Sequence, residues 1–433
     1  MTKVPVDSWI CEKFIIRSNL SQERINIIRI FNMMHCLKIS LLHLALLVGR
    51  QGAVSAFMPS TSSASAIHKS IPLSMSSSSN SEGDNRRGFL TKVLGGAALT
   101  GIVANGIAVQ GPSPYEPAVG SLKGKLVVIT GGNTGLGLES AKRLAAGGAT
   151  VVLTSRNVAK GARAVDSVKS YVMEKNGQGN DNIYTLPLDL CNLESVKAFP
   201  DILRNSEAFK STQHIDVVLN NAGVMAVPDL QLTKDGYEKT FQSNHLGHFA
   251  LTAGLTPLLN ANGSRIVNVS SMAYLIASKG LDMTNLNGEL EYKPWDAYGR
   301  SKLENILFTK ELQNRADAAG KKITVVALHP GTVRTDLPRY MMGGEDKFVS
   351  MQDATPSNVD MLKAAPAFYF TKSVERGANS QVFLSALQGG NDVKGKFFIN
   401  MKENDLLPAA LDMDKAKELW KVSEEMSGIK FEL

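Results

Sequence analysis

From residue 121 onward, the chain alternates short apolar runs with amphipathic stretches. Stretches with a 3.6-residue apolar period, such as 138–146 and 301–314, predict helices between the runs. A further short run at 396–399 predicts a last strand. Almost continuously apolar runs are typical of strands buried on both faces, and they predict a doubly wound α/β fold with a parallel sheet. The main runs cover 126–130, 150–154, 184–189, 215–219, 265–270 and 323–328.

The first 120 residues lack this alternation. We therefore divide the chain into a targeting leader with a linker, 1–120, and a single domain, 121–433. The chain has a net charge of +7, and the leader holds 11 of its 47 Lys and Arg residues but only 6 of its 40 Asp and Glu residues. The domain is thus almost neutral, and we expect no nucleic-acid partner.

The leader begins with two segments that have the character of sorting signals. An apolar run at 39–48 is followed by small residues up to Ala56, as in a signal peptide. Phe57 then precedes a Ser-rich stretch that contains no acidic residue before Glu82, which is similar to a transit peptide. Together they resemble the bipartite presequence of algae with secondary plastids, so we expect a plastid (chloroplast) location. A secretory signal followed by a low-complexity linker is the alternative.

A third segment of the leader has two interpretations. Arg86 and Arg87 precede an uncharged run at 93–109, which resembles a twin-arginine signal. The same run is near the short end of the length range for a membrane anchor. We expect association with the thylakoid membrane through this run, with the domain in the stroma.

Cysteine and histidine residues give no sign of a disulfide framework or a metal site. Cys11, Cys36 and Cys191 are the only cysteines, and no zinc-type spacing is present. His245 and His248 share one helix face without a third ligand nearby. Packing or hydrogen bonding is the expected role of both histidines.

A glycine-rich turn follows the first predicted strand. Gly131, Gly135 and Gly137 lie between this strand and a helix, where glycine permits a tight turn and lets a pyrophosphate approach the backbone. The free N–H groups of the helix N-terminus suit phosphates. We expect a dinucleotide here, also contacted by Asn133, Thr134 and Leu136.

The end of the second predicted strand indicates the kind of dinucleotide. An acidic residue at that place would bind the ribose hydroxyl of NAD, but the chain has Ser155 and Arg156. A guanidinium suits the 2′-phosphate of NADP(H), which is therefore the expected cofactor.

Tyr298 and Lys302 are four residues apart, so they share one face of a helix. An ammonium close to a phenol favours the phenolate and lowers the pKa of the tyrosine from its usual ~10. Such a pair suits proton exchange with a carbonyl/alcohol couple.

The order of these and other motifs resembles the short-chain dehydrogenase/reductase family over about 122–400. The resemblance implies a single Rossmann domain. The phrases at 244–249 and 301–307 are similar to the retinol dehydrogenase branch, which is related to the light-dependent protochlorophyllide reductases. The motifs are the glycine-rich turn at 130–137, Asp189-Leu190, Asn220-Asn-Ala-Gly223, Val269-Ser-Ser271, Tyr298 with Lys302, and Pro330-Gly331.

The resemblance also implies roles for single residues. Tyr298 would be the general acid/base, and Lys302 would lower its pKa and bind the nicotinamide ribose. Ser271, with Ser270 as the rival, would bind the substrate oxygen, and Asn244 would hold a proton relay to Lys302. The family's frequent dimerisation implies a homodimer. Besides Tyr298, Lys302 and the glycine-rich turn, the expected cofactor contacts are Asp189, Leu190, Asn221, Ala222, Gly223, Pro330, Gly331, Val333 and Thr335.

Apolar residues in the segment 334–371 suggest a small lipophilic aldehyde, ketone or alcohol as substrate, although they equally suit packing of the loop. They are Met341, Met342, Phe368, Tyr369 and Phe370.

Two other functions stay open. One is light-dependent protochlorophyllide reduction, although the insert at 272–297 lacks the cysteine typical of those enzymes. The other is a non-catalytic NADP(H)-binding scaffold, which the intact set of Asn244, Ser271, Tyr298 and Lys302 argues against.

Overall fold

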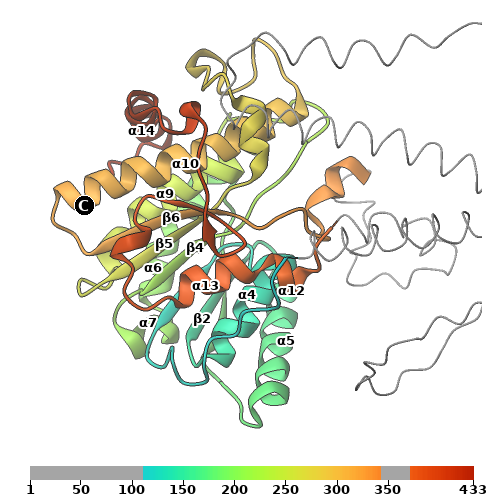
Figure 1. Cartoon of the computed structure of the whole chain (residues 1–433), viewed down its shortest axis with the longest axis vertical. Coiled ribbons are helices and arrows are strands. Elements are labelled where there is room, and N and C mark those ends of the chain that lie inside the picture. Colours follow the sequence, from blue (N-terminus) through green and yellow to red (C-terminus); the bar gives the residue numbers. More distant parts are fainter. Residues whose placement is uncertain (1–110, 343–370) are drawn as a thin grey trace, which may run out of the picture. The chain divides into compact units, whose positions relative to one another are not determined.

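The computed structural model describes residues 111–342 and 371–433. Their strands form one sheet in the order β3-β2-β1-β4-β5-β6-β7-β8 (Figure 1). All neighbouring strands are parallel except β8, which pairs antiparallel with β7. This topology confirms the predicted doubly wound Rossmann fold.

The strands lie close to their predicted places. A turn with positive φ at Asn400 (53°) and Met401 (63°) joins the last two strands, and this hairpin was not predicted. The strands are β1 Leu126–Ile129, β2 Thr150–Ser155, β3 Ile183–Pro187, β4 Val217–Asn220, β5 Ser264–Val269, β6 Ile323–His329, β7 Phe397–Ile399 and β8 Lys402–Glu403.

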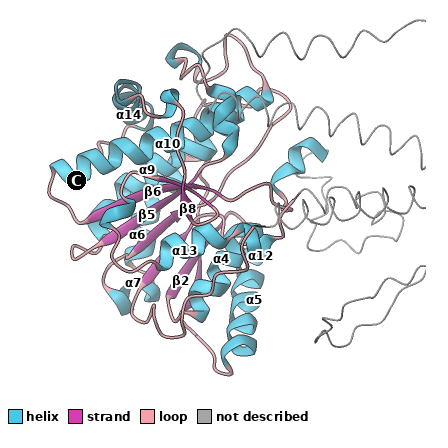
Figure 2. Ribbon diagram, in the orientation of Figure 1, coloured by secondary structure: helices cyan, strands magenta, loops and turns pink. Residues whose placement is uncertain are grey.

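Helices cover both faces of the sheet (Figure 2). The α-helices are α4 Gly135–Ala146, α5 Val158–Asn176, α6 Leu193–Arg204, α7 Glu207–Thr212, α8 Lys239–Phe241, α9 Gly247–Leu255, α10 Pro294–Ala318, α12 Val374–Gly377, α13 Asn379–Ala386 and α14 Met413–Ser427. The remaining helical turns are η2 Gln242–Leu246, a π-helix, and the 3-10 turns η3 Thr256–Leu258, η4 Met272–Ala277, η5 Met283–Asn285, η6 Leu337–Met342, η7 Asn391–Val393 and η8 Pro408–Ala410.

Alternate residues of the strands enter two separate hydrophobic layers. Val127 and Ile129 of β1 pack with α4, α5 and α13, whereas Leu126 and Val128 pack with α6, α7, α9, α10 and α14. Every residue of β1 is at most 1% exposed, which explains why the strand is apolar throughout. The site therefore rests on a sheet that is buried on both sides.

The chain ahead of β1 is attached to the domain, although we expected residues 111–120 to be part of the leader. Arg143 of α4 is fully buried and donates to the backbone carbonyl of Tyr115 at 3.0 Å. The side chain of Asn379 accepts a hydrogen bond from the Tyr115 N–H at 2.9 Å. The sorting signals at 1–110 lie outside the described residues. No helix in 111–342 or 371–433 is both long and apolar enough to cross a membrane.

Candidate active site

The predicted site residues converge at the carboxyl ends of four neighbouring strands. The glycine-rich turn follows β1, Asn221 follows β4, Ser271 follows β5 and Pro330 follows β6. Because β1, β4, β5 and β6 are consecutive in the parallel sheet, these segments meet at one edge. Helix α10 brings Tyr298 and Lys302 to the same edge.

Ser271 and Tyr298 form the centre of the site. Tyr298 is only 5% exposed, and the side chain of Ser271 is near enough to its phenol to lower the pKa of Tyr298. Ser271 caps η4, where its side chain accepts the N–H of Ala273 at 3.1 Å. Ser270 instead donates to the backbone carbonyl of Lys302 at 2.6 Å. The geometry thus favours Ser271 over Ser270 as the residue that meets a substrate.

The pKa of Tyr298 differs from the sequence-based expectation. Burial raises the pKa of Tyr298 to about 12, and the side chain of Ser271 opposes the shift only in part. The ammonium of Lys302 lies 5.6 Å from the centre of the phenol ring and donates to the carbonyl of Val269 at 3.1 Å. Burial also lowers the pKa of Lys302 to about 8. Desolvation therefore outweighs the attraction that we expected to acidify the phenol.

Asn244 lies in the π-helix η2 and is completely buried. Its amide donates to Ser301 at 2.9 Å and to the carbonyl of Val224 at 3.0 Å, and its Oδ1 accepts the Val224 N–H at 2.8 Å. A methyl group at Gly223 would lie 3.0 Å from Oδ1 of Asn244 and 3.7 Å from Nζ of Lys302. Asn244 is thus next to Lys302 but is fixed by Ser301 and Val224, which the sequence did not indicate. π-Helical turns are frequent at functional sites.

A buried hydrogen-bond chain connects this asparagine to the glycine-rich turn. His248 contacts the carbonyl of Asn244 through Nδ1 at 3.0 Å and Oγ1 of Thr130 through Nε2 at 2.8 Å. Burial lowers the pKa of His248 to about 4, so the ring is neutral and carries its proton on Nδ1. His245 instead contacts Ser423 at 2.9 Å. Both histidines have hydrogen-bonding roles.

The glycines of the turn between β1 and α4 are required by backbone angle or by space. Gly131 and Gly135 have φ values of 61° and 54°, which favour glycine. A Cβ at Gly137 would lie 2.5 Å from the carbonyl oxygen of Gly131 and 2.6 Å from Nδ2 of Asn221. Asn221 holds the turn by donating to the carbonyl of Thr130 at 2.8 Å. Such a cradle, ahead of the N-terminus of α4, fits a pyrophosphate.

The segment after β6 lies against this cradle. A Cβ added at Gly135 would lie 3.4 Å from the side chain of Thr335, and Thr134 donates to Asp336 at 3.1 Å. Val333 and Leu136 both lie against Gly377 of α12. The two predicted groups of cofactor residues, one after β1 and one after β6, are therefore adjacent. Asp336 is a site residue that the sequence analysis missed.

Arg156 and Asp189 flank the other end of the predicted cofactor site. Arg156 is exposed directly after β2, and both residues act electrostatically on Cys191. Asp189 accepts the N–H of Cys191 at 3.0 Å. Leu190 is only 6% exposed and belongs to the core, so its side chain is less accessible than expected. An exposed guanidinium beside a cradle for pyrophosphate fits a dinucleotide with an additional phosphate.

Aromatic and aliphatic side chains surround Tyr298 on its outer side. Trp295 is 44% exposed and meets the Tyr298 ring edge to face, with the ring centres 6.1 Å apart. Ile276 is 46% exposed and lies against Gly299. Phe368, Tyr369 and Phe370 lie outside the described residues, as do the side chains of Met341 and Met342. Within the residues that the structure describes, the exposed apolar side chains near Tyr298 thus belong to the insert at 272–297.

His329 was also missed, although it directly precedes Pro330. It accepts the N–H of Met272, the residue after Ser271, at 3.2 Å through Nδ1. Burial, with Lys372 and Lys302 nearby, lowers the pKa of His329 to about 4. Lys372 donates to the carbonyl of Pro330 at 3.2 Å. These contacts fix the loops that carry Ser271 and Gly331.

Comparisons with known proteins agree with this geometry. A family described as short chain dehydrogenase matches residues 125–344. The chain is 38% identical to retinol dehydrogenase 14 of Mus musculus over 315 residues, which are 72% of this chain and 88% of the relative. It is 36% identical to retinol dehydrogenase 12 of Homo sapiens over 313 residues, covering 72% and 89%. A crystal structure of an uncharacterised protein from Mycobacterium paratuberculosis aligns with a TM-score of 0.55 at 31% identity, covering 75% of this chain and all of that chain.

Proposed function

Because the chain belongs to the short-chain dehydrogenase family, we propose that it is an NADP(H)-dependent oxidoreductase that interconverts a lipophilic aldehyde or ketone with its alcohol. Membership of the family makes it a hydride-transferring oxidoreductase with a nicotinamide cofactor, in the branch that resembles the retinol dehydrogenases. The observation that carries the proposal is the grouping of three residues: the side chain of Ser271 acts on the buried phenol of Tyr298, and Lys302 lies one turn along the same helix.

These residues suit proton transfer to a carbonyl oxygen. Bound NADPH supplies the hydride to the carbonyl carbon. Ser271 and Tyr298 hold the carbonyl oxygen, and the phenol of Tyr298 gives up its proton to that oxygen as the alcohol forms. The pKa of Tyr298, raised to about 12, keeps the phenol protonated and ready to donate. The ammonium of Lys302, 5.6 Å from the ring centre, stabilises the resulting phenolate.

The apolar surroundings support a lipophilic substrate. Trp295 is exposed beside Tyr298 and Ile276 is exposed beside the adjoining Gly299, where they offer an apolar surface to the carbon skeleton. Retinol, in the names of the relatives, is an alcohol of this kind.

The test is NADPH oxidation by the purified full chain with retinal and a panel of aliphatic and aromatic aldehydes and ketones. We expect dark turnover of at least one lipophilic carbonyl, reduced ~10²-fold or more by Tyr298→Phe. Tyr184→Phe on β3 is the matched control and should keep its activity. Absence of dark turnover by a chain that binds NADPH would refute the proposal, and turnover of protochlorophyllide only under light would replace it with pigment reduction.

Cofactor preference has a separate test at Arg156. A hydrogen bond to a charged group contributes roughly 1.5–3 kcal/mol, so Arg156→Ser should weaken NADPH binding about ten- to a hundredfold. The affinity for NADH should change little, and exposed Arg163→Ala is the control. Equal loss of both affinities would contradict an NADP-specific role for Arg156.

We also propose that the leader directs the enzyme to a plastid. A fluorescent protein fused behind residues 1–110 should then accumulate in plastids of an alga with secondary plastids. Accumulation in secretory compartments would overturn this proposal.

A further inference from the structure

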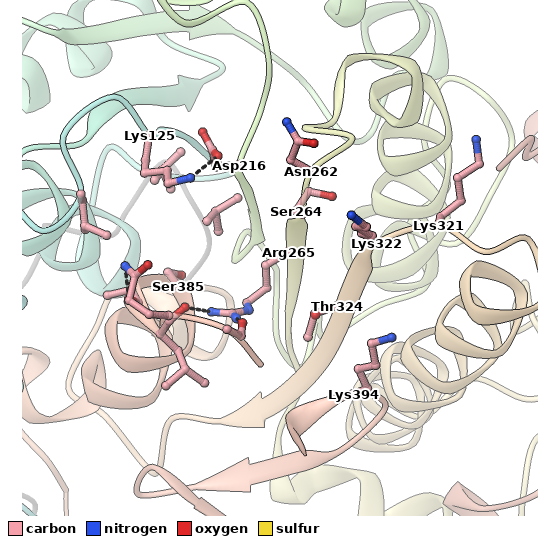
Figure 3. Close-up of a pocket in the computed structure, with 18 of the residues that line it drawn as sticks. Lys125, Asp216, Asn262, Ser264, Arg265, Lys321, Lys322, Thr324, Ser385 and Lys394 are labelled. Atoms are coloured by element: carbon pink, nitrogen blue, oxygen red, sulfur yellow. Dashed lines mark hydrogen bonds and ion pairs between the residues drawn. The ribbon is translucent and has the colours of Figure 1, made fainter. Parts of the chain in front are cut away.

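A cavity lies at the opposite edge of the sheet from the active site. It has a volume of about 620 Å³ and opens at the amino ends of β1, β4, β5 and β6 (Figure 3). Such a volume lies within the range of ~300–1,000 Å³ that is usual for small-molecule sites. The extended chain runs from Ser264 in this cavity along β5 and on to Ser271, so the two sites are about 20 Å apart. One phosphate group cannot contact both sites at that distance.

Basic side chains outnumber acidic ones around the cavity. Lys125 pairs with Asp216 at 3.0 Å, and Lys394 pairs with Asp317 at 2.7 Å. Lys321 and Lys322 are exposed between α10 and β6, and neither forms an ion pair with a carboxylate of the described chain. The lining therefore has a positive excess after its internal pairs are counted. Its charged residues are Lys125, Asp216, Arg265, Asp317, Lys321, Lys322 and Lys394.

Arg265 adds a buried positive charge to this excess. It is only 6% exposed, and its guanidinium donates to the carbonyls of Leu384 at 2.6 Å and Leu387 at 2.7 Å. Within the described residues it has no ion pair with a carboxylate. Burial lowers the pKa of Arg265 to about 10, and the carboxylate of Asp392 opposes this shift only in part. An anion in the cavity would add a second negative charge near this guanidinium.

Two hydroxyl groups among the lining residues have no hydrogen-bond partner within the described part of the chain. They belong to Ser264, 6% exposed, and Ser385, 4% exposed. Buried hydroxyls are normally paired, so unpaired ones need an explanation. A serine hydroxyl reorients by rotation about χ1, and an acceptor in the cavity would then satisfy it.

We propose that this cavity binds a small phosphate-bearing anion. The ammonium groups of Lys321 and Lys322 meet the phosphate oxygens at the mouth, and the hydroxyls of Ser264 and Ser385 meet them on the inner wall. Arg265 provides the positive potential behind these hydroxyls. A soluble phosphorylated compound and a phosphate-bearing lipid headgroup share this chemistry.

Calorimetric titration of the full chain with pyrophosphate tests the proposal. Saturating NADPH keeps pyrophosphate out of the glycine-rich turn, so only a second site is measured. We expect Lys321→Ala with Lys322→Ala to weaken pyrophosphate binding by at least about tenfold. The matched control is Lys417→Ala with Lys421→Ala, two exposed lysines of α14, which should leave the affinity within about twofold.

Vesicles separate the two sources of phosphate. Phosphatidylcholine vesicles with and without phosphatidic acid are sedimented with the full chain and both double variants. Binding of pyrophosphate alone identifies a soluble anion, whereas additional binding to phosphatidic acid that depends on Lys321 and Lys322 identifies a headgroup. If pyrophosphate and phosphatidic acid both fail to bind, or if both bind equally well to the Lys321/Lys322 variant, the proposal is wrong.

Discussion

Asn244 is joined to Ser301 by a buried hydrogen bond of 2.9 Å between their side chains. Ser301 in turn donates to the backbone carbonyl of Tyr298 at 2.8 Å. The π-helix and the start of α10 are therefore one hydrogen-bonded unit, and Ser301 is its connecting residue. Ser301 acts on the chemistry only through the position of Tyr298 and Asn244.

Replacement of Ser301 by alanine should misplace the proton donor without affecting the cofactor. Two buried hydrogen bonds are lost, each worth roughly 0.5–1.5 kcal/mol, so kcat should fall about tenfold. The Kd for NADPH should stay within about twofold. Exposed Ser278→Ala in the adjoining insert serves as the control. A Ser301→Ala enzyme with normal kcat would show that the link is unimportant.

The pH dependence of alcohol oxidation should follow the raised pKa of Tyr298. Oxidation requires the phenolate, whose fraction rises tenfold per pH unit below the pKa of about 12. The rate should therefore rise from pH 6 to 8 and then flatten as Lys302, with a pKa of about 8, loses its charge. Initial rates in buffers of constant ionic strength measure this. A plateau already below pH 7 would instead mean that the phenol is acidified, as the sequence alone suggested.

A methyl group at Gly137 should destroy the cradle. The added Cβ would lie 2.5 Å from the carbonyl oxygen of Gly131, which is backbone and unable to rotate away. Gly137→Ala should abolish NADPH binding and lower the melting temperature. Gly179→Ala, where the nearest atom to the added Cβ is a methionine methyl at 3.5 Å, is the matched control. Normal NADPH affinity in Gly137→Ala would contradict the assignment of the turn.

Glu304 should limit stability at alkaline pH. It is completely buried on α10, neither carboxylate oxygen has a hydrogen bond, and Nε of Arg300 is 3.7 Å away. Burial raises the pKa of Glu304 to about 8 from 4.5. The unfolded chain releases the Glu304 proton more readily than the folded protein does. The stability that protonated Glu304 contributes is therefore fully present below pH 4.5 and is lost as the pH rises through 8.

The test compares melting temperatures of Glu304→Gln and the parent chain at several pH values. They should be similar at pH 5, and the variant should melt at a higher temperature at pH 8.5. Exposed Glu418→Gln on α14 should show no such pH dependence. A constant difference across this range would argue against titration of Glu304.

Most of the fold was predictable because its strands are buried on both faces. Almost continuously apolar runs located β1 to β7 to within about two residues. The β8 strand was not predictable, since its two residues, Lys402 and Glu403, are exposed and follow a turn that only the backbone angles reveal.

For the site, motif order predicted which residues meet, but not how they are held. Nothing in the spacing indicated that His248 would link Asn244 to Thr130, because that chain spans three separate elements. The pKa of Tyr298 was also mispredicted. The spacing of Tyr298 and Lys302 along the helix predicts an attraction that lowers the pKa of Tyr298. The burial that raises this pKa depends on the packing of the whole domain and cannot be read from the spacing.

The contacts of Tyr115 determine how far the N-terminus can be shortened. If proteolytic processing removed the leader up to residue 120, Arg143 would lose the carbonyl that it binds at 3.0 Å and would keep its charge in the interior. Asn379 would lose its bonds to the backbone of residues 112, 113 and 115 at the same time. Arg376 also donates to the carbonyl of Gly111, so a shortened enzyme that keeps all these contacts should begin at Gly111 rather than at the first strand.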